Sequence, residues 1–128
     1  MTRFSHTVVF VRDMDRSVKF YRDALGLPLR FESPEWAEFA TGSCSLALHK
    51  AAEGIAPAVS FEHIPAGHCH VGFTVTDLDE FHKRLVGQGT KCLQEPKKEN
   101  FGRMAVYADP DGLPVGVTQA AMVGTATP

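Results

Sequence analysis

The side chains of this sequence that can bind metals or act as nucleophiles include six histidines and three cysteines. Two of the histidines, His6 and His70, stand 64 residues apart (70 − 6), each at the head of a stretch rich in Val, Phe and Thr. Imidazole is a ligand for zinc, nickel and iron. Histidines at equivalent points of two similar segments predict either a shared metal site or polar side chains that line a cleft.

The three cysteines, Cys44, Cys69 and Cys92, are odd in number, far apart and without a CxxC spacing. This pattern favours reduced thiols over a disulfide framework. Cys69 stands next to His70, but adjacent residues of a strand point to opposite faces. A thiolate–imidazole pair is therefore not expected there.

An internal repeat relates the two histidine-bearing segments. Residues 6–15 align with residues 70–79 at an offset of 64, which is half of the 128 residues of the chain. The matched pairs are His6 and His70, Val11 and Val75, Asp13 and Asp77, Asp15 and Asp79, and Lys19 and Lys83. The repeat predicts two copies of one structural module.

Each copy is expected to contain one strand, one helix and three further strands. Period-two alternation predicts first strands over 4–12 and 68–76. Asp13 and Asp77 then supply helix N-caps, and Gly26 and the stretch 87–89 end the helices. The later strands are predicted at 28–32, 35–41, 44–50, 91–95, 102–108 and 113–119, the last two joined by a turn over residues 109–112. The chain is thus an α+β domain over 1–122, with modules at about 4–50 and 68–119, a linker at 51–67 and a frayed tail at 123–128.

The composition is that of an ordinary globular protein, with 44% hydrophobic and 22% charged residues. The net charge of −2, the isoelectric point of about 6.3 and the scattered basic residues argue against nucleic acid as a partner. No apolar run approaches the roughly 20 residues that a membrane helix requires. The N-terminus does not read as a signal peptide. A soluble cytoplasmic protein with no membrane partner is expected.

The motifs of both copies resemble the vicinal-oxygen-chelate superfamily, which contains glyoxalase I, bleomycin-resistance proteins and extradiol dioxygenases. The first copy carries His6-x5-Arg-Asp-x-Asp-x-Ser-x2-Phe-Tyr-x3-Leu-Gly-Leu27, and the second carries His70-x-Gly-Phe-x-Val75 and Asp109-Pro-Asp-Gly112. The resemblance covers residues 4–119. It implies two tandem βαβββ modules whose half-open sheets form a barrel-like cleft for a metal or a small molecule, and it implies a homodimer.

The resemblance also implies where a metal would be held. Metal-dependent members take one ligand from the first strand of each module, commonly His, and one from the last strand, commonly Glu. His6 and His70 match the first-strand positions, but Ala47 and Gly116 stand at the last-strand positions. Strand parity places His49 on the face of Ala47, where it is a weaker, substitute ligand. The implied cofactor is none, or one divalent ion of zinc, nickel, manganese or iron.

Several aromatic residues and one arginine are predicted to line the cleft and bind the ligand. Aromatic faces and a guanidinium suit a flat or anionic small molecule. Core or dimer-interface packing is the alternative for the rings, and a surface salt bridge is the alternative for the arginine. The predicted ligand-binding residues are Phe10, Trp36, Phe39, His49, Phe101, Arg103 and Tyr107.

Four hypotheses about function remain open at this point. The first is a metal-free small-molecule-binding protein of the bleomycin-resistance kind, because Ala47 and Gly116 cannot bind a cation through their side chains. The second is a metal-dependent glyoxalase-like lyase or isomerase that uses His6, His70 and His49. Extradiol dioxygenase chemistry ranks third, because Gly116 removes the carboxylate that it needs. The fourth is a regulatory or scaffolding module without a ligand.

Overall fold

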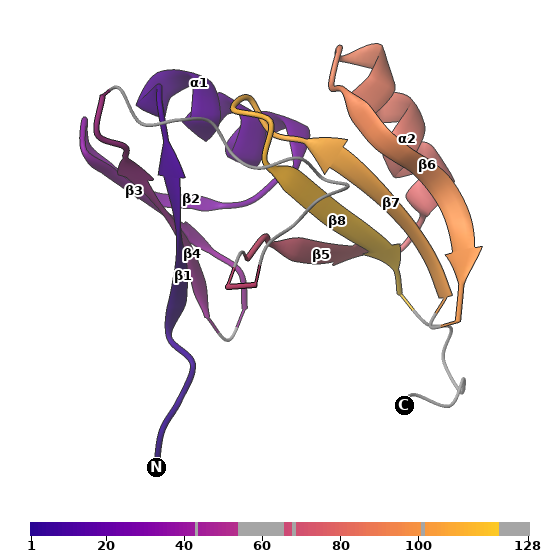
Figure 1. Ribbon diagram of the computed structural model, residues 1–128, viewed down its shortest axis with the longest axis horizontal. Coiled ribbons are helices and arrows are strands. Elements are labelled where there is room, and N and C mark those ends of the chain that lie inside the picture. The colour runs from indigo at the N-terminus through magenta and orange to yellow at the C-terminus, as the bar shows by residue number, and fades with distance from the viewer. Residues whose placement is uncertain (43, 54–65, 68, 101, 121–128) are drawn as a thin grey trace. The chain divides into compact units, whose positions relative to one another are not determined.

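The computed structural model describes residues 1–42, 44–53, 66–67, 69–100 and 102–120. The chain divides into two compact units, Met1–Pro57 and Ala58–Pro128. Each unit contains one four-stranded sheet and its own helix (Figure 1). The division falls inside the segment predicted as a linker.

The first unit has the order strand, helix, three strands. Its elements are β1 (His6–Val11), α1 (Met14–Lys19), the π-helical turn η1 (Phe20–Ala24), β2 (Leu29–Glu32), β3 (Trp36–Ala40) and β4 (Ser45–Lys50). The sheet order is β1-β4-β3-β2. The strand β1 is parallel to β4, whereas β2, β3 and β4 are antiparallel neighbours.

The core of the first unit lies between one face of this sheet and α1, which contacts β3 and β4. Alternate residues of a strand point to the helix, and β1 and β3 accordingly bury Val9, Val11, Ala37 and Phe39 at every second position. Tyr21 of η1 is fully buried and its ring lies 6.2 Å from that of Phe39. The other buried side chains on this side are Val9, Val11, Met14, Val18, Ala37, Leu46 and Leu48.

The second unit repeats the arrangement. Its elements are β5 (Gly72–Val75), α2 (Leu78–Gly87), β6 (Cys92–Glu99), β7 (Gly102–Ala108) and β8 (Pro114–Gln119), in the sheet order β5-β8-β7-β6. Leu78, Phe81 and Leu85 form the buried face of α2. Asp109 builds the turn before β8, because its Oδ1 accepts the backbone N–H groups of Asp111 and Leu113, both at 2.9 Å.

The predicted pair of βαβββ modules is confirmed, and the later strands begin within one residue of their predicted starts. The second copy differs at its beginning, because β5 starts at Gly72 and leaves His70 before the strand rather than in it. The two sheets share no strand pair in the described residues. Most of the linker, His68, Phe101 and the tail lie outside the described residues. None of the described helices has the length and apolar character needed to cross a bilayer.

The helix caps allow a stability prediction. The Asp77 side chain accepts a hydrogen bond from the Glu80 backbone N–H at 3.1 Å, as predicted for the N-cap of α2. Asp77→Ala is expected to lower the free energy of unfolding by about 1 kcal/mol, measured by urea denaturation. Asp77→Asn should keep most of that stability, since its amide oxygen can accept the same bond. Equal urea midpoints for wild type and Asp77→Ala would contradict the role of the cap.

Candidate functional site

One face of the first sheet is not covered by α1, and this open face carries most of the predicted site residues that the structure brings together. Phe10, which projects from it, is 63% exposed, although it lies between Val9 and Val11 of the core. The register places every member on the same side of the sheet. The open face consists of His6, Val8, Phe10, Phe31, Trp36, Glu38, Ala40, Ser45, Ala47 and His49.

Three rings form one row across the open face. Phe10 of β1 is in register with His49 of β4, and His49 is in register with Trp36 of β3. The ring centroids of Phe10 and His49 lie 5.2 Å apart, and those of Trp36 and His49 lie 6.0 Å apart in an edge-to-face arrangement. Both separations are in the range of attractive ring contacts. The row joins three of the predicted ligand-binding residues, drawn from three strands.

The next row across the open face consists of Val8, Ala47, Glu38 and Phe31, in register from β1 to β2. Glu38 is the charged member. Its Oε2 accepts Nη1 of Arg30 at 3.0 Å, and its Oε1 accepts Nε1 of Trp36 at 3.4 Å. A carboxylate therefore lies directly against the aromatic row.

Glu38 and Phe31 were not among the predicted site residues. The signal was present in the alternation of β3, since Trp36 and Glu38 are two residues apart and therefore share a face. The same rule separates Trp36 from Phe39, which are three residues apart. Phe39 is fully buried beneath α1. It therefore belongs to the core and not to the open face where a ligand would meet the sheet.

The predicted residues of β7 also lie on the helix side of their sheet. Arg103 donates from Nη1 and Nη2 to the two carboxylate oxygens of Asp79 on α2, at 3.1 and 3.0 Å. This bidentate bond lowers the pKa of Asp79 and raises that of Arg103, because it stabilises both charged forms. Arg103 thus adopts the salt bridge that was the alternative to ligand binding.

Tyr107 is fully buried, and its hydroxyl is hydrogen-bonded to Nδ1 of His82 on α2 at 2.9 Å. Burial raises the pKa of Tyr107 to about 12. Its ring contacts that of Phe81, at a centroid distance of 6.0 Å. Tyr107 is therefore a packing residue under α2. Phe101, also predicted to bind the ligand, lies outside the described part of the chain.

The candidate metal ligands of the first unit are widely spaced. His6 is opposite Ser45, and His49 lies four residues farther along β4, which separates the two backbones by about 13 Å. A zinc ion needs each imidazole nitrogen within about 2.1 Å. The His49 Nδ1–H also donates to the carbonyl oxygen of Lys50 at 2.7 Å. His49 is therefore poorly placed to complete a site at His6.

The two last-strand positions offer no replacement donors. Ala47 lies between Val8 and Glu38 in its row, is fully buried, and has only a methyl side chain. Gly116 lies between Gly72 and Val106 and has no side chain. Across the described ranges, no group of three or more His, Cys, Asp or Glu side chains is arranged to hold an ion. The residues present do not fit the four-ligand metal site that the resemblance implies.

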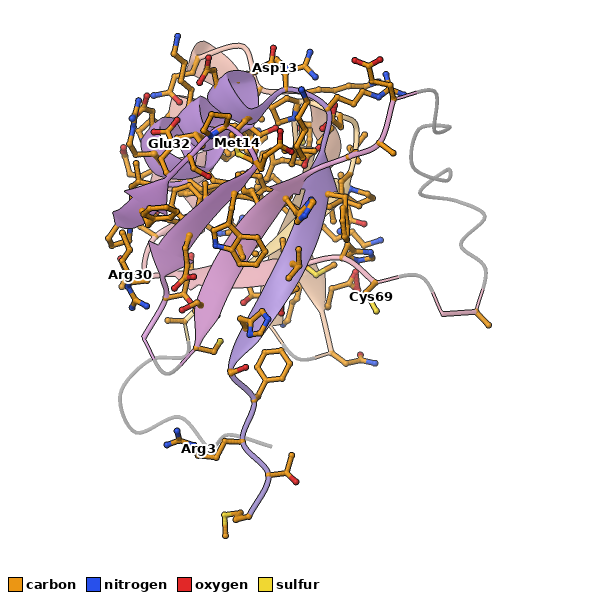
Figure 2. The ribbon with its side chains drawn as sticks, turned by 90° about the vertical axis from the view of Figure 1, so that its left-hand side faces the viewer. Arg3, Asp13, Met14, Arg30, Glu32 and Cys69 are labelled. Carbon is orange, nitrogen blue, oxygen red and sulfur yellow. The ribbon has the colours of Figure 1, made fainter. Side chains whose placement is uncertain are left out.

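A hollow of about 560 Å³ lies elsewhere in the first unit, between the start of α1 and the turn that joins β2 to β3. Figure 2 shows Asp13, Met14 and Glu32 gathered at this end of the sheet, with Arg30 farther along its edge. The lining consists of Arg12, Asp13, Met14, Asp15, Glu32, Ser33, Pro34 and Lys50. These residues carry charges of both signs and include no predicted site residue, so the hollow is separate from the open face.

Comparison with known proteins agrees with this fold. The chain is 33% identical over 112 residues to the protein YraH of Bacillus subtilis strain 168, covering 80% of this chain and 87% of that protein. It is 28% identical over 112 residues to the metallothiol transferase FosB of Shouchella clausii strain KSM-K16, covering 84% and 73%. Its fold matches the crystal structure of TnmS3, an antibiotic binding protein from Streptomyces sp. CB03234, with a TM-score of 0.74, 24% identity, and coverage of 94% and 98%.

A family model matches residues 3–117, which is most of the chain and includes all eight strands except the last two residues of β8. The duplicated strand–helix–three-strand units are the architecture expected from the motifs around His6 and His70. The chain belongs to the Glyoxalase/Bleomycin resistance protein/Dioxygenase superfamily.

Proposed function

We propose that this protein binds a small molecule with a planar aromatic ring on the open face of the first sheet, and that it does so without a metal ion. The observation that carries the proposal is the row of Phe10, His49 and Trp36, whose rings contact one another on the sheet face opposite to α1. Aromatic residues bury large areas on contact with flat ligands and gain further from offset or edge-to-face stacking.

Exposure distinguishes Phe10 and Phe31 of the open face from the core, and Trp36 and His49 are partly buried. The rings of Phe39 and Tyr21 are fully buried and contact each other, whereas Phe10 is 63% and Phe31 is 54% exposed. Leaving such rings in water forgoes the free energy of burying apolar surface. Phe10 and Phe31 lie on the two edge strands of this sheet, so an exposed ring is available at each side of the face.

The last strands support binding rather than metal-assisted catalysis. Enolate or oxyanion chemistry of the superfamily needs a Lewis acid. Ala47 and Gly116 supply no ligand where the family pattern has carboxylates, and His49 is far from His6. TnmS3, a structural neighbour, is an antibiotic binding protein, whereas the FosB relative is a metallothiol transferase. The proposal places this chain with the binding proteins.

Two further expectations belong to the proposal and stay predictions. One is that the second module contributes to the same ligand cleft. The other is that the protein is a cytoplasmic homodimer. The substitutions of Phe10 and Trp36 that test ligand binding are on the open face and do not depend on either expectation.

Fluorescence provides the test, because Trp36 is the single tryptophan of the chain. Titration with the planar tricyclic compounds acridone and proflavine is expected to quench Trp36 to saturation. Phe10→Ala should weaken binding of either compound about threefold to tenfold, because it removes one ring of the row. Val86→Ala is the matched control, since Val86 is an exposed apolar residue of α2.

Two outcomes would contradict the proposed function. One is that neither compound changes the Trp36 emission at concentrations approaching its solubility limit. The other is that Phe10→Ala and Val86→Ala shift the affinity equally, which would place the compound elsewhere on the protein.

A further inference from the structure

We infer that the preferred ligand of the open face is an organic cation, and that Glu38 determines this preference. The inference rests on the proposed function, because it assumes that an aromatic ligand meets the row of Phe10, His49 and Trp36. It adds a charge to the ligand and assigns the residue that recognises this charge.

The position of Glu38 combines a carboxylate with aromatic walls. Phe31 is its cross-strand partner on β2, and Trp36 lies two residues before it on β3. Cross-strand partners have Cβ atoms about 4.5–5.5 Å apart, so a group bound at Glu38 meets the Phe31 ring as well. Tryptophan is the best aromatic partner for a cation, and a carboxylate provides the opposite charge.

The two oxygens of Glu38 differ in how strongly they are engaged. Oε2 accepts the guanidinium of Arg30 at 3.0 Å, whereas the contact described for Oε1 is the longer one from Trp36 Nε1, at 3.4 Å. An ionised carboxylate has about four acceptor positions in total. Oε1 can therefore accept a further N–H donor from a ligand, at the edge of the indole ring.

The ion pair with Arg30 leaves the negative charge of Glu38 available to a ligand. The Arg30 side chain is 55% exposed, and that of Glu38 is 28% exposed. Exposed ion pairs contribute little to stability, because water and salt screen both charges. Arg30 Nη1 also reaches Ser45 Oγ, at 3.4 Å, which gives the guanidinium a second acceptor when a ligand cation approaches Glu38.

The neighbouring residues leave Glu38 as the charge-bearing acid of this face. Its partner on the other side is Ala47, which is uncharged. The other ionisable groups at the open face are His6, His49 and the Arg30 guanidinium that contacts Glu38 and Ser45, and none of them adds a negative charge. A cationic ring system is thus attracted to one defined point of the sheet, next to the rings that would stack on it.

A matched pair of ligands tests the inference. Proflavine is a planar cation at neutral pH, and acridone is a neutral tricyclic of similar size. We expect wild type to bind proflavine about tenfold more tightly than acridone, measured by calorimetry at low ionic strength. Glu38→Gln should reduce this affinity ratio about tenfold, and Arg30→Gln should raise it. Glu95→Gln, which removes an exposed carboxylate of β6, has the same net charge as Glu38→Gln and should leave the ratio as in wild type.

The outcomes separate this inference from the proposed function. Equal affinities for proflavine and acridone, or a ratio that Glu38→Gln and Glu95→Gln change equally, would overturn the role of Glu38 while leaving aromatic binding intact. If neither compound binds, and sedimentation shows that Phe10→Ala dissociates a dimer, the open face is an interface between copies and both proposals fail.

Discussion

Replacing Phe39 with alanine is expected to lower the free energy of unfolding by about 3–5 kcal/mol. Of the substitutions proposed for this protein, this one has the largest expected effect on stability. Phe39 is fully buried, in register with Leu46, and its ring contacts Tyr21 of η1. Alanine removes the contacts of the whole ring and leaves a cavity between the sheet and the helix. Urea denaturation monitored by far-ultraviolet circular dichroism measures the loss.

Two control variants test whether the loss of stability comes from removing a buried ring. Phe39→Leu fills most of the volume and should cost clearly less than the alanine variant. Phe10→Ala changes the same residue type on the opposite face, where the ring is 63% exposed, and should cost a small fraction of the loss at Phe39. Equal losses at the two positions would contradict the assignment of one face to the core and the other to a ligand.

Replacing Trp36 with leucine is expected to weaken binding of acridone and proflavine tenfold or more, with a small effect on stability. Trp36 is half-buried. Its ring contacts that of His49, and its Nε1–H donates to Oε1 of Glu38. Stacking of a flat ring on one aromatic side chain contributes about 1–3 kcal/mol to binding, which corresponds to a fivefold to more than hundredfold change in affinity. Because the variant lacks the fluorescent residue, calorimetry is the suitable measurement.

Trp36→Phe serves as the matched control for this substitution. It keeps a ring on the open face but loses the Nε1–H donor to Glu38, so it should retain most of the affinity for the neutral acridone. If Trp36→Leu binds both compounds as wild type does while remaining folded, the aromatic row is not the ligand site.

Local patterns in the sequence were sufficient to predict the order of the elements. The N-cap positions of Asp13 and Asp77 and the turn at Asp109 follow from side-chain hydrogen bonds within a few residues, and the structure has all three. Period-two alternation separated Phe10 from Val9 and Val11 correctly, because one face of each strand is covered by a helix. The start of β5 was placed too early, because His70 continues the alternation of the strand but the strand itself begins at Gly72.

The composition of the site was less predictable, because it depends on pairings between distant strands. Alternation groups residues within a strand but does not give the register that aligns Phe10, His49 and Trp36 in one row. Tyr107 and Arg103 are attractive ligand-binding types, yet the partners that engage them, His82 and Asp79, come from α2. Glu38 belongs to no sequence motif. Its place in the proposed site follows from its cross-strand partner Phe31 and from the guanidinium of Arg30.

The most direct test of metal-free binding is a calorimetric titration of the purified protein with proflavine before and after exhaustive dialysis against EDTA. The account predicts the same stoichiometry and affinity in both samples, and no change when His6 and His70 are together replaced by alanine. Loss of binding after dialysis, with recovery on addition of zinc, nickel, manganese or iron in wild type but not in the double variant, would contradict it.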